Sequence, residues 1–308
     1  MSMRFGAAYW VQRTGWPELE QAVLQAEEAG FDSLWIDDHL LSDEGPWPDP
    51  KLEGWTTLAA VAAVTSRASL GLMVAANTLR NPGVAAKMAT TIDHVSGGRS
   101  ILGIGAGWFE REHAAFGIDF GAGFGERLDR LGEAVPLLRR LLDGERVSHE
   151  GRFYRLDDAV CAPRPVQDRL PILIGGSGPK KTLPLVARYA DLWNAYGRPE
   201  ELAASDAILR AACDAIGRDE TEIQRTFNAN IVIRATREEA VRDWQSWAMR
   251  HRPQEGEDRL LAFGSVADVA EELDRYRAVG FGHAVIIFRT PFDLETMDRL
   301  PELRAALG

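Results

Sequence analysis

The feature that most constrains this chain is a regular alternation of short apolar segments with longer amphipathic segments. The apolar segments have the length of β-strands and occupy residues 3–9, 33–37, 69–75, 99–104, 171–175, 190–194, 226–233 and 283–288. Helical patterns follow them, at 17–29, 55–66, 83–95, 126–143, 179–189, 200–216, 236–249 and 266–279. Strands that alternate with helices build a parallel sheet, and eight such units can close into a ring. We therefore predict an α/β fold, a (β/α)8 TIM barrel.

Two intervals are longer than a simple crossover requires. Residues 105–170 follow the fourth predicted strand, carry a helical pattern of their own, begin with glycines and end with prolines. We predict an insertion or lid there, within a single domain that spans residues 1–308. Residues 38–54 form a second long loop, after the second strand. In such barrels the loops after the strands carry the chemistry, so residues just past strand ends are the first site candidates.

The composition excludes several other classes of protein. The chain has 308 residues and a formal charge of −11, which argues against nucleic-acid binding. Its two cysteines, Cys161 and Cys213, lie far apart, so the sequence offers neither a zinc ligand pair nor a disulfide framework. No window approaches the roughly 18 apolar residues of a membrane helix, and the N-terminus lacks the pattern of an export signal. We expect a cytoplasmic protein that binds no membrane and no metal.

Titratable side chains directly follow the second predicted strand, where Asp37, Asp38 and His39 end an apolar run. Histidine is the side chain best suited to move a proton near neutral pH. In a purely structural interpretation Asp37 caps the loop and His39 satisfies backbone groups, and the sequence does not separate the two. A metal centre is disfavoured, because none of the six histidines forms a His-x-His pair.

Two glycine-rich segments follow the fourth and fifth predicted strands. The first, LGIGAGW at 102–108, lacks the spacing of a dinucleotide fingerprint, and by itself a plain turn explains it best. The second, GGSGPKK at 175–181, opens the helical pattern that starts at 179. Free amides at a helix N-terminus, together with two lysines, favour a bound phosphate over a simple turn.

Three longer segments carry these motifs in a fixed order. They read AEEAGFDSLWIDDH, then LGLMVAANTLRNPGVAAKMATTIDHVSGGRSILGIGAGWFEREHAAFG, then GRFYRLDDAVCAPRPVQDRLPILIGGSGPKKTLPLVARYADLWNAYG. In this order they resemble the luciferase-like monooxygenase superfamily, specifically its branch of oxidoreductases that depend on the deazaflavin coenzyme F420. The resemblance extends over nearly the whole chain. It implies a (β/α)8 barrel with an insertion after strand four, in agreement with the strand count.

The resemblance also implies roles for individual residues. His39 and Asp38 would be catalytic and lie beside the reactive carbon of the cofactor ring. A bulge with a non-proline cis peptide, behind the ring, aligns with Met73–Val74. The residues implied to contact the cofactor are Asp38, His39, Met73, Val74, Ala75, Asn77, Gly105, Ala106, Gly107 and, around its phosphate, Gly175, Gly176, Ser177 and Gly178.

Candidate contacts for the substrate lie after the first and last strands and in the two long intervals: Trp10, Gln12, Trp47, Trp108 and Arg289. Members of the branch that oxidise glucose 6-phosphate carry a glutamate after the strand-four glycine, whereas the aligned residue here is Ala106. This departure argues against a sugar-phosphate substrate and against that acid catalyst.

The resemblance implies an enzyme that transfers a hydride between coenzyme F420 and a small organic substrate. The alternative is a two-component monooxygenase that uses reduced FMN and O2, since both cofactors carry a phosphate and a tricyclic ring. A barrel without turnover and a hydrolase centred on Asp37, Asp38 and His39 are further alternatives, which the sequence supports less. The family also implies a homodimer, and a separate reductase as a source of reduced cofactor.

Overall fold

The centre of the molecule is a closed barrel of eight parallel strands. In this computed structural model, which describes residues 2–43, 49–251 and 261–308, the barrel strands are β1 (Arg4–Tyr9), β2 (Ser33–Ile36), β3 (Ser69–Leu72), β5 (Ser100–Gly105), β8 (Ile172–Gly175), β9 (Leu192–Ala195), β10 (Gln224–Ile233) and β12 (His283–Phe288). They pair in this order, and β12 pairs with β1 to close the ring. The predicted (β/α)8 barrel is confirmed.

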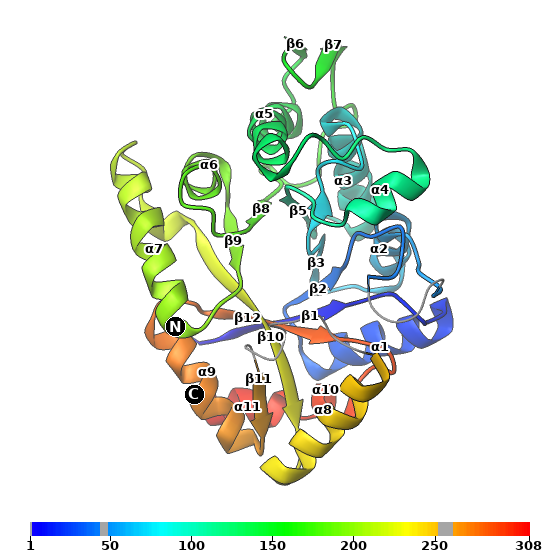
Figure 1. Cartoon of the computed structure of the whole chain (residues 1–308), viewed down its shortest axis with the longest axis vertical. Helices are drawn as coiled ribbons and strands as arrows, with labels where there is room; N and C mark the ends of the chain where they lie inside the picture. Colours follow the sequence, from blue (N-terminus) through cyan, green and yellow to red (C-terminus); the bar gives the residue numbers. More distant parts are fainter. Residues whose placement is uncertain (1, 44–48, 252–260) are drawn as a thin grey trace.

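Helices follow the strands and surround the barrel (Figure 1). They are α1 (Trp16–Ala29), α2 (Gly54–Val64), α3 (Pro82–Ser96), α4 (Glu110–Phe116), α5 (Phe124–Leu142), α6 (Thr182–Tyr189), α7 (Pro199–Asp214), α8 (Arg237–His251), α9 (Val266–Ala278), α10 (Leu294–Asp298) and α11 (Leu300–Leu307), with the 3-10 turn η1 (Glu220–Glu222). Gly30 and Gly97 end α1 and α3 in the left-handed conformation that terminates helices. None of the helices in the described ranges has the length and apolarity of a membrane span.

The barrel strands bury side chains on both faces. The cluster inside the barrel consists of Ala8, Trp10, Trp35, Met73, Ile101, Leu173, Leu192, Val285 and Ile287, with Val74 packed against it. A larger cluster fills the space between the outer face of the strands and the helices. Burial on both faces explains why these strands appear in the sequence as nearly continuous apolar runs.

The third barrel strand is shorter than the predicted segment 69–75. β3 ends at Leu72, and β4 (Ala75–Ala76) resumes the pairing with β5. The peptide bond between them, Met73–Val74, is cis, as predicted. The strand is thus interrupted where it reaches the edge of the barrel.

Three further strands were not predicted. β10 continues past the barrel, and its last four residues pair with β11 (Leu261–Gly264). The insertion after β5 contains the antiparallel hairpin β6 (Val147–Glu150) and β7 (Arg155–Ala159). This hairpin projects beyond α5 at the top of Figure 1.

Candidate active site

A cavity of about 470 Å³ lies at the carboxyl ends of the barrel strands. Residues that follow β1, β2, β3, β5 and β8 line it together with residues of β9 and β10. The predicted site residues in its wall are Trp10, Asp38, His39, Met73, Val74, Ala75, Gly105, Ala106, Gly107, Trp108, Gly175, Gly176, Ser177 and Gly178. The closed barrel therefore brings most of the predicted residues together in one place.

Asp38 is a buried carboxylate with one satisfied oxygen. Its Oδ2 accepts hydrogen bonds from the backbone amide of Ala76 (3.0 Å) and from the Arg80 guanidinium (2.8 Å). Burial raises the pKa of Asp38 above its ordinary value, although the charge of Arg80 opposes this effect. Its Oδ1 is buried and has no hydrogen-bond partner in the part of the chain that the structure describes. A Cβ atom at Gly54 would lie 3.0 Å from this oxygen, so Oδ1 is packed against the start of α2.

His39 is held on the same wall by contacts from the insertion. Its Nδ1 lies 3.1 Å from Oε1 of Glu112, and the rings of Trp108 and Phe109 meet it edge-on, at centroid distances of 5.3 and 5.7 Å. Burial by itself lowers the pKa of His39, but the hydrogen bond with Glu112 and the charge of Asp37 outweigh burial, so the pKa is raised above its ordinary value. The imidazole is therefore suited to carry a proton near neutral pH.

Glycines on β5 and β8 make room for Val74. A Cβ atom at Gly105 would lie 2.8 Å from Cγ2 of Val74, and a Cβ atom at Gly175 would lie 3.2 Å from Cγ1. Both distances are shorter than ordinary van der Waals contact, so larger residues would displace Val74. The ends of these two strands thus present bare backbone to the cavity.

The segment after β8 differs from the prediction in two respects. α6 begins at Thr182 and not at 179, and the amide of Thr182 donates a hydrogen bond to the carbonyl of Gly178. Lys181 forms an ion pair with Asp129 on α5. The backbone before the turn lines the cavity, and Lys181, one of the two lysines of the predicted phosphate site, is paired with Asp129 instead.

Some predicted residues lie outside this cavity. The amide of Asn77 donates a hydrogen bond to the Tyr154 hydroxyl at 2.9 Å, and Gln12 is buried and accepts one from Ser42. Trp47 falls outside the described residues. Neither Asn77 nor Gln12 belongs to the cavity wall.

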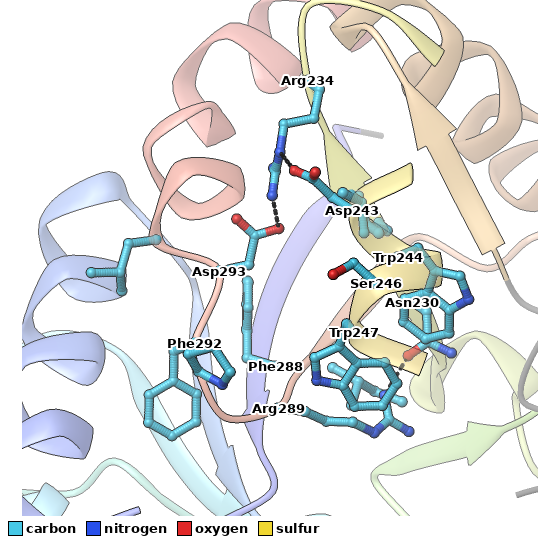
Figure 2. A pocket seen from close by; sticks show the side chains of 15 residues that line it. Asn230, Arg234, Asp243, Trp244, Ser246, Trp247, Phe288, Arg289, Phe292 and Asp293 are labelled. Atoms are coloured by element: carbon cyan, nitrogen blue, oxygen red, sulfur yellow. Dashed lines mark hydrogen bonds and ion pairs between the residues drawn. The ribbon is translucent and has the colours of Figure 1, made fainter. Parts of the chain in front are cut away.

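Arg289 lines a neighbouring cavity of about 410 Å³, shown in Figure 2. Its Nη1 donates a hydrogen bond to Oδ1 of Asn230 at 2.6 Å. The guanidinium carbon lies 5.3 Å from the ring centroid of Trp10 and 5.2 Å from that of Trp247. Trp10 lines the first cavity, whereas Arg289 does not.

Several polar residues that complete the wall were not predicted from the sequence. Asn194 on β9 donates a hydrogen bond to Oδ1 of Asn228 on β10 (2.8 Å), and Asn228 donates one to the Tyr196 hydroxyl (2.6 Å). In the sequence, both asparagines stand out as polar residues within otherwise apolar strand segments. Glu112, the partner of His39, had a weaker signal, an acidic residue next to His113 in the insertion.

Comparison with known proteins agrees with this arrangement. A family model described as luciferase-like monooxygenase matches residues 2–249. The F420-dependent glucose-6-phosphate dehydrogenase of Nakamurella multipartita is 31% identical, over 99% of this chain and 98% of the relative. The enzyme of the same name from Kineococcus radiotolerans is 37% identical, over 75% of this chain and 68% of the relative.

Among solved structures, an F420-dependent secondary alcohol dehydrogenase in complex with an F420-acetone adduct shares the fold. Its TM-score is 0.84 at 20% sequence identity, and the alignment covers 100% of both chains. The barrel, the cavity at the strand ends and the extent of the family match lead to one assignment. This chain belongs to the luciferase-like monooxygenase family.

Proposed function

We propose that this enzyme is an oxidoreductase that transfers a hydride between coenzyme F420 and a small organic substrate. The observation that carries the proposal is one cavity in which Asp38 and His39 form one wall and the glycine backbone of β5 and β8 forms another. The F420 dependence named for the two bacterial relatives supports the same cofactor here. Neither argument depends on the identity of the substrate.

The residues of the cavity fit such a cofactor. Asp38, which accepts a hydrogen bond from the amide of Ala76, would hold this segment of the cavity wall in place beside the ring. The backbone at Gly105 would lie against the flat ring, and the backbone at Gly176–Gly178 would bind the phosphate. Bound coenzyme F420 would supply or accept the hydride.

His39 would carry the proton that accompanies the hydride. Its raised pKa keeps a larger fraction of the imidazole protonated near neutral pH than an unperturbed histidine would have. When a carbonyl, imine or activated alkene is reduced, negative charge develops on the substrate, and a nearby imidazolium stabilises that charge and donates the proton. Oxidation of an alcohol would use the same group in the reverse direction.

We further propose that the substrate carries no phosphate. The described residues that line the cavity include no lysine or arginine, and the carboxylates of Asp37 and Asp38 are already paired with Lys51 and Arg80 behind the wall. A phosphorylated sugar would therefore find no free cationic side chain among these residues to pair with its phosphate. Ala106, which stands where the glucose 6-phosphate enzymes carry a glutamate, is consistent with a different substrate.

We also propose that the enzyme is a cytoplasmic homodimer. An apolar groove on α2 and α3, in which Val84 is 53% exposed, supports a homodimer formed through these helices. A cytoplasmic location is favoured by Cys161 and Cys213, which are both buried free thiols. A separate reductase would regenerate reduced cofactor in the cell.

The first experiment is a titration of the apoprotein with coenzyme F420 and with FMN, in oxidised and reduced forms, followed by cofactor fluorescence and calorimetry. Selective binding of F420 is expected and would direct a substrate screen to carbonyls, imines, activated alkenes and alcohols. Selective binding of FMN with oxygen consumption would replace this proposal by a monooxygenase. Binding of neither cofactor would contradict both.

His39→Asn provides the mechanistic test once a substrate is found. We expect the variant to lose turnover by about 100-fold or more, because the proton donor is gone, with a smaller change in its affinity for F420. Stopped-flow measurement of F420 absorbance under single-turnover conditions would report the hydride step directly. Unchanged single-turnover rates would remove His39 from the mechanism.

A further inference from the structure

Helix α4 of the insertion carries two adjacent ionisable side chains that are buried. Glu112 and His113 are almost completely inaccessible, whereas Glu110 and Arg111 on the same helix are exposed. A glutamate is rarely buried to this extent unless its charge is compensated. The contacts of Glu112 therefore need a specific explanation.

Both carboxylate oxygens of Glu112 contact the loop after β2. Oε2 accepts a hydrogen bond from the backbone amide of Leu40 at 2.7 Å, and Oε1 lies 3.1 Å from Nδ1 of His39. In the described part of the chain, His39 is the only ion-pair partner of Glu112. A carboxylate can only accept hydrogen bonds, so Nδ1 must carry the proton in this contact.

We infer that Glu112 is a positioning residue for His39, which fixes the imidazole with its Nδ1 protonated and reserves Nε2 for exchange with the substrate. This inference rests on the proposed hydride transfer. The insertion thereby contributes to the reaction, because Glu112 on α4 orients His39 on the loop after β2. A carboxylate that orients an imidazole in this way acts through the histidine and needs no contact with the substrate.

The proton balance follows from this arrangement. In the reductive direction bound coenzyme F420 would supply the hydride to the substrate carbon, and Nε2 of His39 would give its proton to the substrate heteroatom. The substrate is thus reduced by two electrons, and the imidazolium becomes a neutral imidazole that keeps its proton on Nδ1. Because Glu112 accepts the hydrogen bond at Nδ1, it stabilises the cationic state of His39 more than the neutral one.

Other charged groups around His39 do not replace this contact. Asp37 is paired with Lys51, and the charge of Lys51 opposes that of Asp37 at His39. Asp43 adds a weaker negative charge. Glu112 is the group in direct hydrogen-bond contact with the ring, so its removal should change both the pKa and the tautomer of His39.

The position of α4 has a second support that is independent of Glu112. Nδ1 of His113 donates a hydrogen bond to the carbonyl of Phe109 (2.8 Å), and Nε2 accepts one from the hydroxyl of Thr78 (2.7 Å). A change at position 112 therefore leaves the helix attached to the loop after β4. Glu112→Gln keeps the shape of the side chain and removes its charge.

The test is a pH titration of the protein labelled with 15N-histidine, in the wild type, in Glu112→Gln and in the exposed control Glu110→Gln. The His39 signal is assigned by its loss in His39→Gln. In the wild type we expect neutral His39 to carry its proton on Nδ1. In Glu112→Gln the pKa of His39 should fall by about one pH unit and the tautomer preference should weaken, and Glu110→Gln should match the wild type.

Two results would overturn the inference: a wild-type His39 whose neutral form is protonated on Nε2, or a Glu112→Gln titration that matches the wild type. The wild-type tautomer decides the question even if Glu112→Gln does not fold. Binding of F420 to Glu112→Gln, followed by fluorescence, should stay within about threefold of the wild type. A wild type that binds no F420 would contradict the proposed function but would leave the NMR result on Glu112 intact.

Discussion

His39 is partly buried and His283 is fully buried, and their pKa values are shifted in opposite directions. His39 faces a carboxylate, and its pKa is raised. His283, at the start of β12, contacts the Ser33 hydroxyl (3.0 Å) and the amide nitrogen of Gln224 (3.1 Å), and no carboxylate among the described residues is in hydrogen-bond contact with it. Burial therefore lowers the pKa of His283 to about 3. His39 lies in the candidate active site, whereas His283 lies at the opposite, N-terminal end of the barrel strands.

The lowered pKa of His283 predicts a loss of stability in acid. The unfolded chain binds a proton at this residue below about pH 6.5, whereas the folded protein does so only near pH 3. The contribution of His283 is therefore complete above about pH 6.5 and decreases by at most about 1.4 kcal/mol per pH unit as the pH falls toward 3. His283→Gln should flatten the dependence of the unfolding free energy on pH between 6.5 and 4.

Urea denaturation at several pH values would measure this effect. His94→Gln is the matched control, because His94 is an exposed histidine near the end of α3. The control should keep the wild-type pH dependence, including the part that carboxylates contribute. If His283→Gln and the wild type lose stability in parallel, His283 does not stay neutral in the folded protein.

At the scale of elements, the barrel strands lie close to their predicted positions because each is a short apolar run buried on both faces. The local structure at the strand ends was harder to predict from the sequence. The start of α6 at Thr182 depends on a hydrogen bond to Gly178, and β11 depends on the extension of β10 beyond the barrel. Neither feature produces a periodic pattern of apolar residues from which it could be predicted.

The candidate site was predictable to the extent that it consists of strand ends. Asp38, His39 and the glycines after β5 and β8 were found in this way, with the resemblance to a family supplying their roles. Glu112 was missed because its partner His39 is 73 positions away in the sequence, and only the folded insertion brings them together. Pairings between distant loops leave no periodic signal in a single sequence.

Glycines in two elements should respond oppositely to the addition of a methyl group. Gly105 ends β5, where a Cβ atom would lie 2.8 Å from Val74, and Val74 is also close to Gly175. Gly132 lies within α5, where a Cβ atom would meet nothing within 4 Å. We expect Gly105→Ala to weaken F420 binding about tenfold, or about 1.4 kcal/mol, by displacing Val74 into the cavity.

Gly132→Ala is expected to stabilise the protein by about 0.5–1 kcal/mol, because alanine loses less backbone entropy in a helix than glycine does. Its affinity for F420 should equal that of the wild type. Fluorescence titration and thermal denaturation of both variants would separate the effect on the site from the effect on the fold. Wild-type affinity in Gly105→Ala would show that Val74 can shift without disturbing the cavity.

At the scale of the whole molecule, one face of the barrel retains an apolar groove of about 700 Å³. Trp55 and Ala59 of α2, Val84 and Met88 of α3, and Val160 after β7 line it. Val84 and Val160 are 53% and 44% exposed, which is unusual for valines grouped around one apolar depression. We assign this groove to the proposed homodimer, since a second copy would cover the same helices on both partners.

The assignment predicts that a charge in the groove separates the partners. In a symmetric dimer, Val84→Glu would bury one carboxylate from each partner in an apolar contact. Analytical ultracentrifugation at micromolar concentration should therefore show a dimer for the wild type and a monomer for the variant. Ile208→Glu is the matched control, because Ile208 is 42% exposed on α7 and does not line the groove. A wild type that sediments as a monomer, or a Val84→Glu variant that remains dimeric, would exclude this face as the contact.

Since α3 follows the β4 segment, which is hydrogen-bonded to Asp38, loss of the dimer should also weaken F420 binding. Titration of the monomeric variant with F420 would measure how much dimer formation contributes to the affinity.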